Sequence, residues 1–208
     1  MKAGFKIAAL ALLSSSCFSS AEAGNPREHD GFFLRLSAGM GHADTEIDDE
    51  VGEGEIELSG PAGEYNFAVG GIVRENLALH GTLFGWWVND PDMEVFDDSG
   101  AVEEGSLTGW VNMNAWGGGV TYYLMPINLY FSGSVAAAML TFGNNATFDT
   151  HSDVGFAGDF TVGKEWWAGE DWGLGFSGGM SLHSIPASET SENWSGKTFA
   201  LRFSATFN

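Results

Sequence analysis

Residues 32–41 read FFLRLSAGMG, and their side chains alternate between two kinds. One set is apolar and consists of Phe32, Leu34, Leu36, Ala38 and Met40. The other set is mostly small or polar and consists of Phe33, Arg35, Ser37, Gly39 and Gly41. Successive side chains of a β-strand point to opposite faces, so this period of two predicts a strand with one face suited to lipid.

The same alternation returns at the end of the chain. Residues 198–207 read TFALRFSATF, with Phe199, Leu201, Phe203, Ala205 and Phe207 on one face. Between the two stretches we predict six further strands, near residues 62–73, 76–87, 107–124, 128–142, 154–167 and 172–183. The phase of the fourth strand slips across Gly117-Gly118-Gly119, which predicts a bulge or bend there.

The connections between these strands alternate in length. Short turns fall at residues 74–75, 125–127 and 168–171, and long connections at 43–61, 88–106, 143–153 and 184–196. Short turns at one end and long loops at the other are typical of membrane-spanning barrels with an even strand count. We therefore expect an all-β fold, an eight-stranded antiparallel up-and-down transmembrane β-barrel.

The N-terminus has the three regions of an export signal. Lys2 and Lys6 precede a short apolar stretch from Ile7 to Leu13, and small residues follow it as far as Ala21-Glu22-Ala23. We predict a signal peptide over residues 1–23 and a barrel domain over 24–208. The chain has one cysteine, Cys17, within the signal. An acylated Cys17 is the alternative, although the residues before it lack the leucine of a lipoprotein signal.

Charge is strongly unbalanced: the formal net charge is −20, with eight Lys and Arg in the whole chain. So few scattered cations cannot neutralise a phosphate backbone, which argues against nucleic acid as a partner. The acidic residues gather in two predicted loops, the first with Asp44, Glu46, Asp48, Asp49, Glu50, Glu53, Glu55 and Glu57, the second with Asp90, Asp92, Glu94, Asp97, Asp98, Glu103 and Glu104. Such oxygens could bind divalent cations and bridge to lipopolysaccharide phosphates; plain solvated loops are the alternative.

The face opposite the apolar one carries small and polar residues, as expected for a lumen: Glu64, Asn66, His80, Thr82, Asn112, Asn114, Ser132, Ser134, Asp159 and Ser181. Eight strands leave an interior just wide enough for side chains to fill. Arg35 and Arg202 also point inward and need counter-charges in such an interior. We predict an ion-pair network of Arg35 and Arg202 with Glu64, Asp159 and Glu165, with an ion pathway as the alternative.

Aromatic residues gather at the predicted strand ends. Tyr122, Tyr123, Tyr130, Trp166, Trp167 and Trp172 lie near short turns, and Trp86, Trp87 and Trp110 near long connections. Amphipathic rings prefer the two membrane interfaces, so we predict that these nine residues form the aromatic belts. A packed core of large aromatics is the alternative.

Three stretches make the chain resemble the OmpA/OmpX-type small outer-membrane barrels. They are Gly31–Leu36, the turn region Gly163–Trp167 with Asp171–Gly175, and the closing strand Phe199–Phe207. The resemblance implies a place in the outer membrane of a Gram-negative envelope, among lipid and lipopolysaccharide. It also implies that Phe203 and Phe207 belong to the signal read by the barrel-assembly machinery, although Asn208 follows the terminal aromatic residue.

Architecture alone does not fix function. We expect a non-catalytic barrel, without cofactor, that has a structural or surface-interaction role through its acidic loops. One alternative is a narrow channel for small or hydrophobic molecules, with lateral exit near the glycine-rich strand. Another is a lipid A-modifying enzyme, for which Ser181 with His183 and His151 with Ser152 are the candidate pairs.

Overall fold

The computed structural model describes His29 and residues 31–49, 54–96, 102–144, 149–188 and 192–207. The predicted signal peptide, residues 1–23, lies outside the described residues, as do Glu50, Glu53, Asp97 and Asp98. Within the described residues, no helix is long or apolar enough to span a membrane.

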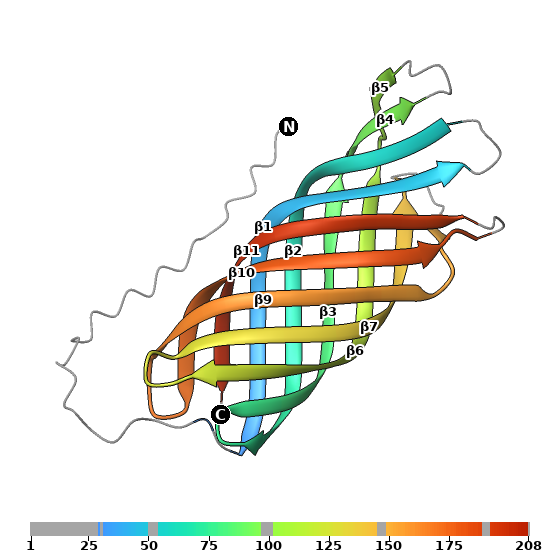
Figure 1. The fold of residues 1–208 in the computed structure, drawn as a ribbon. Coiled ribbons are helices and arrows are strands. Elements are labelled where there is room, and N and C mark those ends of the chain that lie inside the picture. The colour runs from blue at the N-terminus through green and yellow to red at the C-terminus, as the bar shows by residue number, and fades with distance from the viewer. Residues whose placement is uncertain are drawn as a thin grey trace, which may run out of the picture.

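The described strands form one antiparallel sheet that closes into a ring (Figure 1). The eight strands of the ring are β1 (Phe32–Asp49), β2 (Gly54–Arg74), β3 (Leu77–Asn89), β6 (Trp110–Leu124), β7 (Leu129–Gly143), β9 (Gly155–Trp167), β10 (Trp172–Pro186) and β11 (Asn193–Phe207). The first strand pairs with both β2 and β11, which closes the barrel. The predicted all-β, eight-stranded antiparallel barrel is confirmed.

Three short strands extend the sheet beyond the ring, at the end opposite the short turns. They are β4 (Asp92–Phe96), β5 (Val102–Ser106) and β8 (Asp149–His151). β4 pairs with the outer part of β2, β5 with β4, and β8 with β7. By the usual orientation of such barrels, this end faces outward and the short turns face the periplasm.

The prediction of a long loop over residues 43–61 is wrong. β1 and β2 stay paired as far as Asp49 with Gly54, so most of that stretch is strand. The reason is that the alternation persists: Leu58 is buried among lumen residues, while Glu57 beside it faces away. Residues 88–106 likewise contain the β4–β5 pair rather than a plain loop.

The predicted bulge at Gly117–Gly119 is also wrong, because β6 keeps an unbroken register with both neighbours there. The irregularity in the ring lies between Ile72 and Arg74, next to a short turn. In β6 it is the chemistry that changes along the strand, not the register. Between the glycines and the outer end of β6 the inward residues are apolar, as at Met113. On the periplasmic side of the glycines the first inward side chain is polar, Thr121. Asn112 and Asn114, predicted to line the lumen, therefore face outward.

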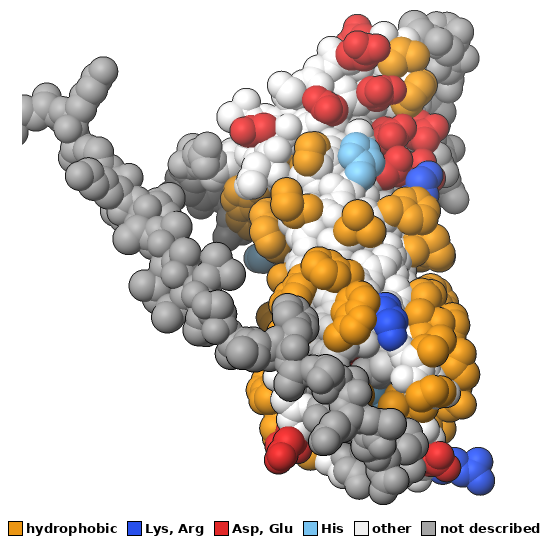
Figure 2. Space-filling view, turned by 90° about the vertical axis from the view of Figure 1, so that its left-hand side faces the viewer, with side chains coloured by type: hydrophobic (Ala, Val, Ile, Leu, Met, Phe, Trp, Pro, Cys, Tyr) orange, Lys and Arg blue, Asp and Glu red, His pale blue; other side chains and the backbone are white. Residues whose placement is uncertain are grey.

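An apolar belt surrounds the ring. Large hydrophobic side chains from its strands are exposed, among them Phe156 at 79% and Leu201 at 78%. Figure 2 shows these side chains as a broad band, with most of the acidic side chains gathered at one end. Exposed apolar surface on this scale is unstable in water and fits the hydrocarbon of a bilayer.

Three predicted interface aromatics lie inside the barrel instead. Trp86, Tyr123 and Tyr130 are each at most 1% exposed and face the lumen. Their neighbours Trp87 and Tyr122 face outward, as do Trp110, Trp166 and Trp172. Doublets such as Trp86-Trp87 place one ring on each face of a strand, so only one of the two can reach lipid. Trp167 stacks on the ring of His29 at 5.0 Å near the periplasmic turns.

Candidate functional site

Arg202 on β11 lies at the centre of the lumen between two carboxylates from other walls. Its Nε donates to Glu64 Oε2 on β2 at 2.6 Å, and its Nη2 donates to Asp159 Oδ2 on β9 at 2.6 Å. All three side chains are nearly fully buried. Because β2 and β9 are not neighbours in the ring, the guanidinium spans the lumen and obstructs it.

Glycines make room for this long side chain. Arg202, Gly39 and Glu64 lie in one register row across β11, β1 and β2, so no side chain stands between the ion-pair partners. On the other side, a Cβ at Gly179 would lie 2.6 Å from Arg202 Cζ. Asn66 and Thr161 complete the network by donating to Asp159 Oδ1, each at 3.0 Å.

The prediction that Arg35 and Glu165 join this ion-pair network is wrong. Arg35 Nη2 donates to Ser132 Oγ at 2.8 Å, and its guanidinium lies 4.7 Å from the ring centroid of Tyr130. Glu165 accepts from Thr206 Oγ1 at 2.6 Å and Ser204 Oγ at 3.2 Å. Alternation along a strand predicts which face a side chain lies on. Its position along the barrel axis also depends on strand register and tilt, and this position separates Arg35 and Glu165 from Arg202.

The lumen on the outer side of Arg202 is filled by apolar side chains. The larger members of this cluster are Leu58, Phe84, Trp86, Val88, Val111, Met113, Leu140 and Ile185. A second cluster, toward the periplasm, contains Phe33, Tyr123 and Tyr130. There the His29 ring stacks on Tyr123 at 3.6 Å and its Nε2 hydrogen-bonds Asn128 Oδ1 at 2.8 Å. In the described residues the lumen is thus sealed by an apolar, an ionic and an aromatic layer.

An apolar pocket opens at the outer end, above the apolar layer. Its volume is about 320 Å³, and its wall comes from Ile56, Leu58, Met93, Leu107, Phe142, Thr150, His151, Ser152, Ala187, Ser188 and Trp194. Leu58 belongs both to this wall and to the apolar layer, so the lumen cluster forms part of the pocket floor. The pocket has the size and apolar lining of a small-molecule site.

The acidic residues of the two predicted loops meet on one face of the outer sheet. Glu46, Glu57, Glu94 and Glu104 stand directly opposite one another on β1, β2, β4 and β5. We call these four residues the acidic row. Like charges placed directly opposite across strands destabilise a sheet. Burial, followed by the neighbouring charge of Asp44, raises the pKa of Glu57 above its ordinary value.

The other acidic residues have varied positions. Asp44 lies 3.9 Å from Lys197 Nζ, and Asp92 lies on β4 opposite Ser59 and Ser106. Asp90 accepts from the backbone N–H of Gly109 at 3.0 Å, so it joins the two ends of the segment that carries β4 and β5. Asp48 and Asp49 belong to the end of β1. Among the described residues, no three Asp, Glu, His or Cys side chains are arranged to hold one metal ion.

Neither candidate catalytic pair is assembled. His183 Nε2 is 3.0 Å from Thr45 Oγ1 rather than bonded to Ser181, and its Nδ1 has no hydrogen-bond partner. Ser152 Oγ accepts from Leu140 N and donates to the carbonyl of Asp153, both at 2.9 Å. Activation of a hydroxyl needs a base that a third group orients, and these described residues do not provide that arrangement.

Comparison with solved structures identifies similar barrels. The Neisserial surface protein A, NspA, has a TM-score of 0.52 and 9% identity, over 85% of this chain and 96% of that one. The outer membrane protein OprG from Pseudomonas aeruginosa has a TM-score of 0.47 and 12% identity, over 88% of this chain and 100% of that one. No family model and no curated protein sequence matches. With its apolar belt, the chain therefore has the fold of a small outer-membrane β-barrel protein.

Proposed function

We propose that the protein is a non-catalytic outer-membrane barrel whose acidic outer sheet binds cationic partners at the cell surface. The acidic row is the observation that carries this proposal. Four carboxylates aligned across four strands repel one another, and that cost falls when positive charge lies over them. No three described Asp, Glu, His or Cys side chains are arranged around one metal ion. The row therefore suits a partner whose positive charges are distributed along its length, such as a basic peptide segment.

Binding of a basic peptide to the refolded barrel tests this proposal. Oligolysine should bind the wild type at low salt and dissociate as salt rises, because exposed charges are screened. We expect E46Q/E57Q/E94Q to weaken binding by about tenfold, the factor that corresponds to roughly 1.4 kcal/mol. The matched control is E75Q/E170Q/D171N, which removes three exposed carboxylates at the periplasmic turns. Equal losses in both variants would mean that net charge alone attracts the peptide.

Lowering the pH gives a second arm of the same experiment. The pKa of Glu57 is raised, so this carboxylate takes up its proton at a higher pH than an ordinary glutamate. As the pH is lowered from 7, oligolysine binding should therefore begin to weaken at a higher pH for the wild type than for the E57Q variant. The affinity of each protein is measured by titration at constant salt.

A second candidate function is the binding of small apolar molecules at the outer end of the barrel. It is supported by the outer pocket, whose floor continues into the apolar layer of the lumen. An aliphatic diazirine probe should label the peptides that contain Phe142 and Trp194, and the M93R variant should suppress that labelling by placing a larger, charged side chain in the pocket wall. Labelling confined to the lipid-facing belt in both proteins would remove this candidate.

A further inference from the structure

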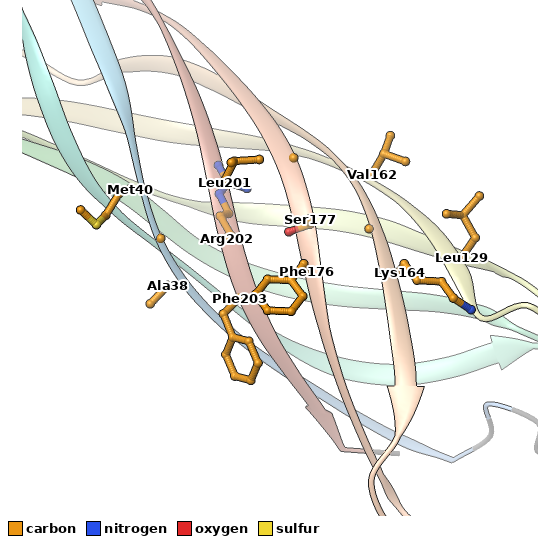
Figure 3. A pocket seen from close by; sticks show the side chains of 13 residues that line it. Ala38, Met40, Leu129, Val162, Lys164, Phe176, Ser177, Leu201, Arg202 and Phe203 are labelled. Carbon is orange, nitrogen blue, oxygen red and sulfur yellow. The ribbon is translucent and has the colours of Figure 1, made fainter. Parts of the chain in front are cut away.

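The lipid-facing wall of the barrel is hollowed over β9, β10, β11 and β1. A groove of about 780 Å³ runs along this wall and continues into a second hollow of about 690 Å³. The two share Met40, Val162, Gly178 and Leu201, so they form one continuous surface feature. Figure 3 shows the apolar side chains of the larger hollow together with Lys164.

Gly178 creates the hollow. It stands between Val162 and Leu201 in a single register row, with Met40 next along that row. A Cβ at Gly178 would meet nothing within 4 Å, so the missing side chain leaves open space between large neighbours. In the next outward-facing row toward the periplasm, the rings of Phe176 and Phe203 pack edge to face with centroids 5.6 Å apart, and they line the periplasmic part of the groove.

Lys164 supplies a positive charge at the periplasmic end of this groove. It lies in the row of Phe176 and Phe203, three residues before β9 ends at Trp167. On the described part of the apolar belt it is the one charged side chain. A charge on the lipid face destabilises a barrel least near the interface, which a lysine can reach with its flexible chain.

The ammonium of Lys164 has an aromatic neighbour but no carboxylate partner among the described residues. Its Nζ lies 5.5 Å from the ring centroid of Trp166, an outward-facing aromatic residue. No described carboxylate oxygen lies within 4 Å of Nζ. The groove therefore combines an apolar surface with one cation toward its periplasmic end.

We propose that this groove is a binding site for one phospholipid of the periplasmic leaflet. Lys164 donates to the phosphodiester, and an acyl chain lies over Gly178 between Val162 and Leu201. A second barrel fits less well, because the described belt offers no anionic side chain for Lys164 and a hollow does not complement itself across a twofold axis. The site is independent of the acidic row, which lies at the other end of the barrel.

Native mass spectrometry of the refolded full barrel, with phosphatidylglycerol added to the micelles, tests the site. The wild type should retain one lipid per barrel. K164Q should weaken retention about tenfold through loss of a charge-assisted hydrogen bond, and K164R should restore it. G178L should also lose the lipid, because its side chain fills the hollow.

The control variant is G81L, which adds the same side chain on the opposite wall. A Cβ at Gly81 meets only two backbone oxygens, both at 3.9 Å, so the substitution is tolerated there. G81L should retain the lipid as the wild type does. Equal retention by the wild type, K164Q and G178L would overturn the proposal, and so would a spectrum in which two copies of the chain, without lipid, are the bound species.

Discussion

Replacing Arg202 by methionine should lower the free energy of unfolding by about 3–5 kcal/mol, because it leaves Glu64 and Asp159 as unpaired charges in a buried lumen. Both carboxylates are at most 2% exposed in this network. The measurement is equilibrium unfolding by urea in lipid vesicles, followed by the mobility of unheated protein on a gel.

Two controls separate the loss of pairing from the loss of a cation. The triple variant R202M/E64Q/D159N removes all three charges, and its stability should return to within about 1 kcal/mol of the wild type. Lys197→Met removes a cation whose side chain is 56% exposed, and should have an effect below about 1 kcal/mol. If R202M were as stable as K197M, the lumen would be wet enough to solvate the carboxylates, and the sealed ionic layer would be wrong.

Trp86→Ala should lower the free energy of unfolding by about 3–5 kcal/mol, since it removes a large ring from a packed interior and leaves a cavity. Trp86 is 1% exposed and its ring centroid lies 5.8 Å from that of His183 across the lumen. The same urea titration measures the loss.

The adjacent residue is the matched control. Trp87 is 41% exposed and faces outward, so Trp87→Ala opens no cavity and should destabilise by about 1 kcal/mol. The two variants have the same composition and differ only in the face of β3 that is changed. Comparable losses, or a larger loss for W87A, would contradict the assignment of the lumen face.

The ring of strands could be predicted from sequence because period-two alternation is a local property. Residues 32–41 and 198–207 each show it over ten residues, with Phe33 as the large apolar exception on the polar face, and the structure pairs the two stretches in the closing ladder. Arg202, Glu64 and Asp159 were predicted to face the lumen, and the structure brings them together. The local pattern sufficed there because each of the three lies beside an outward-facing aromatic residue, namely Phe203, Tyr65 and Phe160.

Other features depend on contacts that the pattern does not contain. The outer half of the lumen is apolar, so Val111 and Met113 have the character of lipid-facing residues although they point inward. Because apolar residues point inward there, the sequence pattern assigned the two faces of β6 the wrong way round, and Asn112 and Asn114 were predicted to line the lumen. His29 gave no signal at all, because it precedes the first strand and is held by the distant Tyr123 and Asn128.

The acidic row also needed the structure. Glu46 and Glu57 belong to one predicted loop, and Glu94 and Glu104 to another. Their alignment follows from the pairing of β2 with β4 outside the ring, between residues far apart in the chain. Composition predicted an acidic outer end but could not predict a single row of four directly opposed carboxylates.

Arg202 and its two carboxylates seal this barrel, with apolar and aromatic layers on either side. Planar-bilayer recording on the refolded wild-type protein tests it most directly. We predict that the folded barrel, once inserted, shows no stable stepwise ion conductance. Large, long-lived conductance steps from the folded protein would contradict the sealed lumen and would indicate a continuous water-filled path through the barrel.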